Sequence, residues 1–197
     1  MNDAQIAPES PYSGPRQAGI KVIVYKEIKP GDLRKFQAES NDSPTGGGAR
    51  DLRFRPHERF DPIFAQLLPT VKVQRGKNVR VGPVGWYDDI KPARLEAEYW
   101  SPTQARPGEG RWAKVHNFAP FQKELPDGEG RLVILLIQDS NDDVWLRIET
   151  ESELRSPSWD QKVIRAIFEC IDSQTRGNRS AQGYIDFVRG KRFCHAG

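Results

Sequence analysis

The chain has 197 residues, a formal net charge of +3 and a charged fraction of 29%, and its mean hydropathy is −0.70. This length fits one domain, or one domain with a tail, and is sufficient to bury a core. The longest apolar run, Leu132–Ile137, is too short to cross a bilayer, so no membrane partner is expected. Because the N-terminus has no secretory signal and two cysteines do not make a disulfide framework, the expected location is the cytoplasm.

In the first part of the chain, the pattern predicts a tail, then short strands around one helix. Residues 1–19, rich in proline, serine and glycine, form an expected disordered N-terminal tail. One or two helical turns are expected over 30–39. Apolar residues at helical spacing predict a helix over His57–Leu68, and a turn is expected at 76–78. Apolar residues in period-two alternation predict the strands Ile20–Ile28, Leu52–Arg55, Val71–Arg75 and Val79–Val84.

The second part predicts further strands and one long helix. The helix is expected over Trp159–Thr175, with Ser158 as its N-cap and Gly177 as its stop. Residues 183–193 fit either a short helix or a final strand. Most connections are too short for parallel crossovers, so the expected fold is a mostly antiparallel β-barrel or sandwich with peripheral helices. Apolar patterning predicts the strands Arg94–Trp100, Arg111–Phe118, Leu132–Gln138 and Val144–Thr150.

Two loops combine glycine with arginine. Residues 41–55 contain three consecutive glycines followed by arginines at 50, 53 and 55. Because glycine lacks a Cβ, the backbone there is able to approach a phosphate or a base edge closely. A flexible hairpin loop with solvated charges is the alternative. The second loop, 101–110, holds Arg106 between Trp100 and Trp112, which fit either base stacking or core packing.

Charge is unevenly distributed along the chain. Lys and Arg outnumber Asp and Glu by 15 to 11 over 31–117 and by 5 to 1 over 176–197, whereas 118–175 carries 6 basic and 12 acidic residues. A polyanion would prefer the basic half and the basic tail. Solvated faces without a partner are the alternative.

The chain offers no complete catalytic constellation. Nucleotide-binding glycine motifs and a nucleophile elbow are absent from the sequence. The histidines are widely spaced and Cys170 lies on the apolar side of the predicted long helix, so no metal ligand set and no cofactor are expected. Two Glu-x-Glu pairs, at 96/98 and 149/151, lack a lysine at the spacing that magnesium-dependent nucleases use, and outward-facing strand carboxylates are the simpler interpretation. Enzymatic activity is therefore left open and not favoured.

The order of features from Asn41 to Pro69 resembles a known domain. In chain order, the features are Asn41-Asp42, Thr45 with three glycines, a short strand, a proline and a helix closing at Leu67-Leu68-Pro69. This order is similar to that of the N-terminal effector-binding domain of EcoRII-type restriction endonucleases. That domain is a DNA-binding pseudobarrel related to plant B-three transcription-factor domains. The likeness continues through the strand 95–100, the loop 106–112 and the hairpin 132–148. It implies a mostly antiparallel DNA-binding pseudobarrel over 20–150, with a C-terminal helical extension over 151–197 packed on the same domain.

In that family, two loops act as arms that grip the duplex, and by position these would be 41–53 and 101–114. The arm residues of this chain differ from those of the family and no nuclease domain is attached, so no recognition sequence is transferred. The DNA-binding residues that the resemblance and the two loops imply are Asn41, Thr45, Gly47, Gly48, Arg50, Arg53, Arg55, Lys77, Trp100, Arg106, Arg111, Trp112 and Lys114.

Three functions remain open from the sequence. The favoured one is a double-stranded DNA-binding protein in restriction-modification or phage defence, with a separate nuclease or another defence subunit as a further partner. The second is a protein-binding subunit of a larger complex that uses the acidic stretch 139–153 and the long helix. The third is a divergent metal-dependent nuclease.

Overall fold

The computed structural model describes residues 19–29, 32, 51–87, 92–102, 108–115, 130–174 and 180–196. The predicted tail, the helical turns over 30–39 apart from Asp32, and the stop at Gly177 lie outside these residues. The helices are α2 (His57–Leu67), α4 (Glu151–Leu154) and α5 (Gln161–Gln174). The strands are β1 (Ile20–Ile28), β2 (Leu52–Phe54), β3 (Thr70–Gln74), β4 (Lys77–Tyr87), β5 (Pro92–Trp100), β6 (Gly110–Ala113), β7 (Leu132–Asp139), β8 (Val144–Thr150), β9 (Ala181–Asp186) and β10 (Lys191–Ala196).

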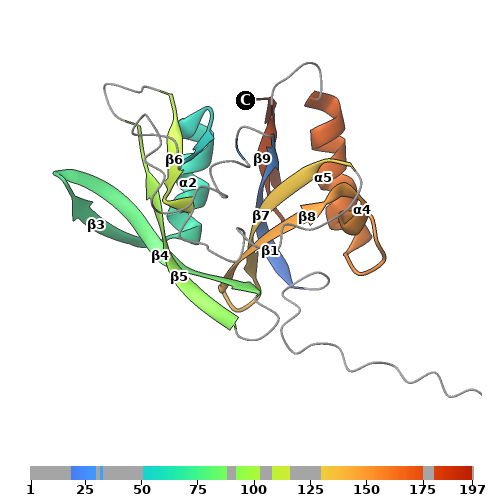
Figure 1. Cartoon of the computed structure of the whole chain (residues 1–197), viewed down its shortest axis with the longest axis horizontal. Helices are drawn as coiled ribbons and strands as arrows, with labels where there is room; N and C mark the ends of the chain where they lie inside the picture. Colours follow the sequence, from blue (N-terminus) through green and yellow to red (C-terminus); the bar gives the residue numbers. More distant parts are fainter. Residues whose placement is uncertain are drawn as a thin grey trace, which may run out of the picture.

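All these strands belong to one curled sheet (Figure 1). Its order is β10-β9-β1-β7-β8-β4-β5-β6-β2, and β3 pairs with β4 beside this path. Strands β4 and β8 run parallel where Gly85 pairs with Trp145, while neighbours such as β1 and β7 or β4 and β5 are antiparallel. The predicted mainly β class with peripheral helices is confirmed. The prediction of a mostly antiparallel sheet is wrong, because the sheet has mixed strand orientation, with β4 and β8 parallel although they are far apart in the sequence. Closure into a pseudobarrel stays a prediction.

The strands β1 and β7 are buried on both faces. Residues Val22 and Val24 of β1 join a core cluster with α2, whereas Ile23 and Tyr25 join a second cluster with α5. This division follows from the period of two along a strand. Figure 1 shows α2 inside the curl of the sheet and α4 and α5 on the opposite side of β1 and β7. Coverage on both faces explains why Leu132–Ile137 is continuously apolar.

Helix α2 determines where β5 lies. It begins directly after Pro56, as predicted, and ends at Leu67, one residue before the predicted end. The ring of Phe64 stacks on Tyr99 of β5 with centroids 3.9 Å apart. The Tyr99 hydroxyl donates a hydrogen bond of 2.7 Å to Asp61 of the same helix. Helix α2 therefore holds β5, the strand that ends at Trp100, against the core.

Helix α5 is confirmed, but its N-cap is not Ser158. The amide of Lys162 donates to Oδ1 of Asp160 at 2.8 Å, so Asp160 caps the helix. The Ser158 hydroxyl instead lies 2.6 Å from the Ser156 hydroxyl. Trp159, which lies between Ser158 and Asp160 in the sequence, is buried. The helix therefore starts at Gln161, two residues later than the sequence pattern predicts.

The region 151–197 is only partly helical, which corrects the predicted helical extension. Strands β9 and β10 form a hairpin over the residues that fitted either a helix or a strand, and β9 pairs with β1 in the main sheet. The short helix α4 was not predicted, and its first turn is capped by the Thr150 hydroxyl, which accepts from the Glu153 amide at 3.2 Å.

The turn expected at 76–78 lies instead at Arg75 and Gly76, both with positive φ.

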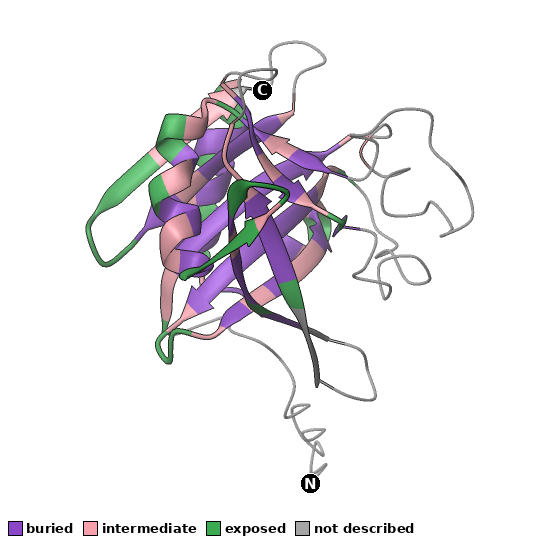
Figure 2. Ribbon diagram, turned by 90° about the vertical axis from the view of Figure 1, so that its left-hand side faces the viewer, coloured by how far each residue is buried: buried purple, intermediate pink, exposed green. Residues whose placement is uncertain are grey.

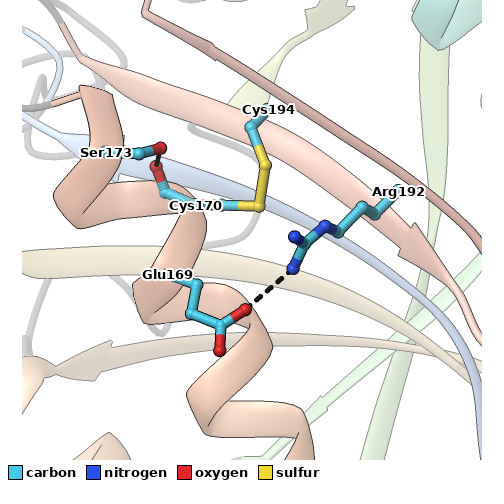
Figure 3. Close-up of a disulfide and its surroundings, with 5 residues drawn as sticks. All are labelled: Glu169, Cys170, Ser173, Arg192 and Cys194. Carbon is cyan, nitrogen blue, oxygen red and sulfur yellow. Dashed lines mark hydrogen bonds and ion pairs between the residues drawn. A yellow bond between two sulfur atoms is a disulfide. The ribbon is translucent and has the colours of Figure 1, made fainter.

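The two cysteines form a disulfide, contrary to the expectation from their number. Cys170 of α5 and Cys194 of β10 are bonded, with their Cα atoms 5.4 Å apart (Figure 3). The burial predicted for Cys170 is confirmed. The hairpin β9–β10 brings the pair together by returning the chain along α5. The expectation of a reducing cytoplasm, which was drawn in part from the number of cysteines, therefore loses that part of its support.

Figure 2 shows that most strands are largely buried, whereas the exposed residues gather on the outer side of α5, along β3 and at hairpin turns. Among the described residues, no helix is long and apolar enough to cross a membrane.

Candidate nucleic-acid interface

Seven of the thirteen predicted DNA-binding residues lie in the described part of the chain. The other six, Asn41, Thr45, Gly47, Gly48, Arg50 and Arg106, lie outside it. The seven that are placed are Arg53, Arg55, Lys77, Trp100, Arg111, Trp112 and Lys114.

Three of these residues form a row across three strands. Arg53 of β2 pairs with Arg111 of β6, and Arg111 pairs with Trp100 of β5. Side chains of directly paired residues point to the same face of a sheet. The guanidinium carbon of Arg111 lies 6.0 Å from the centre of the Trp100 ring, within the range of a cation–π contact. We call this surface, formed by Arg53, Arg55, Trp100, Arg111 and Lys114 with the carboxylates they contact, the β5–β6 face.

Trp112 does not belong to the β5–β6 face. It is 1% exposed and lies in the core cluster with Leu52 and Tyr99, its two cross-strand partners. Because neighbours along a strand alternate between faces, Arg111 and Trp112 point in opposite directions. Trp112 is therefore a core residue, which corrects its assignment as a DNA contact.

Two nearly buried carboxylates hold the arginines of the β5–β6 face. Glu109 forms an ion pair of 3.4 Å with Nε of Arg53 and a closer one with Arg55. Asp51 accepts a hydrogen bond of 3.2 Å from Nη1 of Arg111. Three guanidinium groups are thus oriented by two carboxylates, and their positive charge is partly neutralised in the free protein.

Glu98 organises the other side of the face. Its carboxylate accepts hydrogen bonds from Nζ of Lys114 at 2.5 Å, Nε1 of Trp100 at 3.3 Å and Nε2 of Gln74 at 3.4 Å. Burial favours the neutral form of this carboxyl, but the hydrogen bonds from Lys114, Gln74 and Trp100 outweigh burial and lower its pKa below the usual value. Glu98 therefore stays ionised and fixes both the Trp100 indole and the Lys114 ammonium.

The hairpin β3–β4 extends the face toward Lys77. This exposed lysine lies two residues from Val79, the cross-strand partner of Trp100, so it points to the same side of the sheet. The side chains of Lys72 and Gln74 reach from β3 to Glu96 and Glu98 of β5, across β4. These crossings explain why Val79 is buried although it is part of neither core cluster.

The Glu-x-Glu pairs have basic partners that their sequence spacing does not reveal. Glu96 contacts Lys72 at 2.6 Å and Glu98 contacts Lys114 at 2.5 Å, each lysine coming from another segment. In the second pair, Glu149 binds Arg147 of the same strand. The described residues contain no group of three or more His, Cys, Asp or Glu that could hold a metal ion.

Sequence reasoning missed Asp51 and Glu109, which position the arginines. Both are acidic residues inside segments noted for their basic residues. Only the pairing of β2 with β6 brings Asp51 to Arg111 and Glu109 to Arg53. No local pattern could have identified them, because each contact spans more than fifty residues of sequence.

No protein-family model matches the chain, and no curated protein matches it significantly. The structure is that of a mainly β protein with one curled sheet. Its β5–β6 face carries paired arginines, a half-buried tryptophan and oriented carboxylates.

Proposed function

We propose that the chain binds double-stranded DNA through the β5–β6 face and the two loops that adjoin its strands in the sequence. The observation that carries the proposal is the row Arg53–Arg111–Trp100 across β2, β6 and β5. Both loops that were predicted to grip DNA connect to this row: residues 41–50 precede β2, and 103–107 lie between β5 and β6. The described ends of the two predicted arms therefore meet on one surface, where Arg53 pairs with Arg111.

The chemistry of the face suits a nucleic acid. Guanidinium groups form bidentate hydrogen bonds with phosphates and with the O6 and N7 acceptors of guanine. An indole beside a guanidinium supplies a flat surface for a sugar or an unstacked base. Lys77 and Lys114 lie at the edges of the face, where contacts to the phosphate backbone are expected. On binding, phosphate oxygens would replace Glu109 and Asp51 as partners of the arginines.

The finer parts of the proposal rest on the resemblance described above. They are a pseudobarrel of the EcoRII effector-binding type, a role in restriction-modification or phage defence, and a separate nuclease or defence subunit as partner. The cytoplasmic location was expected on other grounds, and the disulfide between Cys170 and Cys194 argues against it.

A salt-titrated binding measurement tests the proposal. Fluorescence anisotropy with random-sequence duplexes should give a plot of log affinity against log salt with a slope of about −4.5 from the five cations of the face and its edges, which are Arg53, Arg55, Arg111, Lys114 and Lys77. Arg53→Ala with Arg111→Ala should reduce the slope by about 2 and weaken binding roughly 100-fold. Arg165→Ala, on the exposed side of α5, is the matched control and should leave the slope unchanged. Equal affinities for the control and the double variant would reject the β5–β6 face as the DNA site.

A protein-binding role is the second candidate, and β3 is the observation that favours it. Among the described strands, β3 pairs only with β4, and its Val71 and Val73 are 50% and 74% exposed. An exposed edge with apolar side chains is suited to receive a strand of another protein. The acidic stretch and long helix predicted for this role are less suited, because the apolar side of α5 is buried in the core. If Val71→Thr with Val73→Thr abolishes a partner contact and leaves duplex affinity unchanged, this second role is supported.

A further inference from the structure

The β3–β4 hairpin carries positive charge that is not balanced within the hairpin. Residues 70–82 contain no acidic residue and four basic ones, Lys72, Arg75, Lys77 and Arg80. In the described part of the chain, Lys72 is the one among these four with an ion-pair partner, which is Glu96 of β5. On the β5–β6 face, by contrast, each arginine is held by a carboxylate. The charge of the hairpin is therefore available to an acidic partner.

The backbone of β3 has an outer edge. In the described sheet β3 pairs with β4, and its other side lies at the margin of the sheet (Figure 1). The turn of the hairpin has two residues, both with positive φ, as in a type I′ turn. Gln74 and Lys77 flank this turn and form a hydrogen-bonded pair in such a hairpin, and bonded pairs then alternate along the strands. The amide and carbonyl groups of Val71 and Val73 therefore point away from β4, toward the outer edge.

The same two valines expose their side chains on the face opposite to the β5–β6 face. Val71 and Val73 are 50% and 74% exposed. Val71 pairs with Arg80, and Arg80 pairs with the core residue Tyr99, so these side chains point to the core side of the sheet. Trp100 points to the other side, because neighbours along a strand alternate. A partner bound at the valines would thus leave the β5–β6 face open to DNA.

We propose that the outer edge of β3 binds an extended acidic peptide of another protein by strand addition. The proposal names the partner for the second candidate function, protein binding at β3, and does not depend on DNA binding. The backbone of the peptide would pair with Val71 and Val73, and its apolar side chains would pack beside the two valines. Its carboxylates would lie near Arg75 and Arg80. A second copy of the chain is a poor partner because two basic hairpins repel each other, and a nucleic acid has no strand that completes the edge.

The test uses a peptide that alternates glutamate with valine, and the same peptide with glutamine in place of glutamate. Fluorescence anisotropy with the full chain should show the acidic peptide binding at least about tenfold more tightly than the glutamine peptide. Amide NMR shifts should be concentrated along β3. Equal binding of the two peptides, no binding of the acidic peptide, or shifts away from β3 would overturn the proposal.

Val73→Pro tests the backbone contact. Proline removes the outward-pointing amide at this position but no hydrogen bond to β4, and edge strands tolerate it. The variant should bind the acidic peptide at least about tenfold more weakly and bind duplex DNA as the wild-type protein does. Val73→Ile, which keeps both the amide and a β-branched side chain, is the matched control and should bind as wild type. Urea unfolding verifies that both variants are folded, and equal peptide affinity of the two would exclude strand addition.

Arg75→Asn combined with Arg80→Gln tests the charge. Asparagine tolerates the positive φ of 51° at position 75. The double variant should weaken binding of the acidic peptide about tenfold, while affinity for the glutamine peptide and the salt slope of duplex binding stay unchanged. Lys162→Gln with Arg165→Gln, at exposed positions of α5, removes the same charge elsewhere and should leave peptide affinity unchanged. Equal loss in the two double variants would show general charge attraction and overturn the site.

Two other occupants of the hairpin have their own readouts. If the acidic peptide does not bind and Arg75→Asn with Arg80→Gln lowers duplex affinity, the hairpin contacts nucleic acid and the peptide proposal is wrong. If the chain self-associates in sedimentation and Val73→Pro abolishes this association, a second copy occupies the edge and the proposal is also wrong. Arg53 and Arg111 are unchanged in all these variants, so DNA binding at the β5–β6 face is judged separately by its own double variant.

Discussion

The two halves of the curled sheet differ in how many of their faces are covered. Strands β1 and β7 are packed between α2 on one side and α5 on the other, and their side chains are apolar on both faces. Strands β2, β5 and β6 pack on α2 through one face, while the other carries Arg53, Trp100 and Arg111. The covered half provides stability, and the open half has polar side chains available for a partner. The following predictions test this division, from the largest expected effect to the smallest.

The largest effect is expected in the doubly covered half. Ile167 of α5 is fully buried against β1 and β7. Replacing it with alanine should lower the free energy of unfolding by about 2–5 kcal/mol, because the lost contacts leave a cavity. Urea unfolding measures this cost, with Arg165→Ala on the exposed side of the same helix as control. Duplex affinity of the folded fraction should not change, and a matching loss of affinity would contradict the division of roles.

The disulfide should contribute a similar amount to the same half. It closes a loop between α5 and β10 with a sequence separation of 24 residues, for which chain entropy predicts roughly 3 kcal/mol of stabilisation. Cys170→Ser combined with Cys194→Ser should lower the free energy of unfolding by about this amount. Reduced wild-type protein serves as the comparison, and thiol counting reports the oxidation state. A double variant as stable as the oxidised protein would show that hairpin packing alone holds β10 on α5.

A smaller, pH-dependent contribution is expected from Glu151 at the start of α4. Hydrogen bonds from Arg131 lower the pKa of this carboxyl from 4.5 to about 2, against the opposing effect of burial. A depressed pKa in the folded state stabilises the protein above pH 4.5, and this contribution is lost as the pH falls toward 2. After solvent screening we expect about 1 kcal/mol.

The measurement for Glu151 is the free energy of unfolding across this pH range. Glu151→Gln should flatten its acid limb, because the variant has no proton to take up at this position. Glu153→Gln, on the same short helix, is the control and should keep the slope of the wild-type protein. A Glu151→Gln profile that coincides with wild type would show that the pair with Arg131 does not set acid stability.

The smallest effect is expected in the open half, at Glu109. This carboxylate neutralises Arg53 and Arg55 in the free protein. Replacing it with glutamine should raise duplex affinity about threefold. In the variant, Arg53 and Arg55 would not have to break an ion pair with residue 109 before they contact phosphates. Anisotropy at low salt measures the gain, with Glu169→Gln on α5 as the matched control. A fall in affinity would mean that Glu109 orients the arginines and that their alignment matters more than their free charge.

Local patterns in the sequence were sufficient for most elements. Alternation predicts β1 with the observed ends, and the continuous apolar run predicts the doubly buried β7. The helix α2 follows from apolar spacing after Pro56. These predictions succeed because the period of side-chain exposure is a property of each segment by itself. The cap of α5 at Asp160 was missed, because Ser158 and Asp160 are both suitable N-cap residues and local preference does not choose between them.

Tertiary structure alone decided which charges meet. The sequence determined that Arg53, Arg111 and Trp100 are present near glycine-containing loops, and strand alternation predicts that each points away from an apolar neighbour. Their placement in one row depends on the order β5-β6-β2, and this order arises from long-range backbone pairing. Similarly, the disulfide depends on the return of β10 along α5. Contacts between distant segments depend on how elements pack, and a local pattern carries no information about that packing.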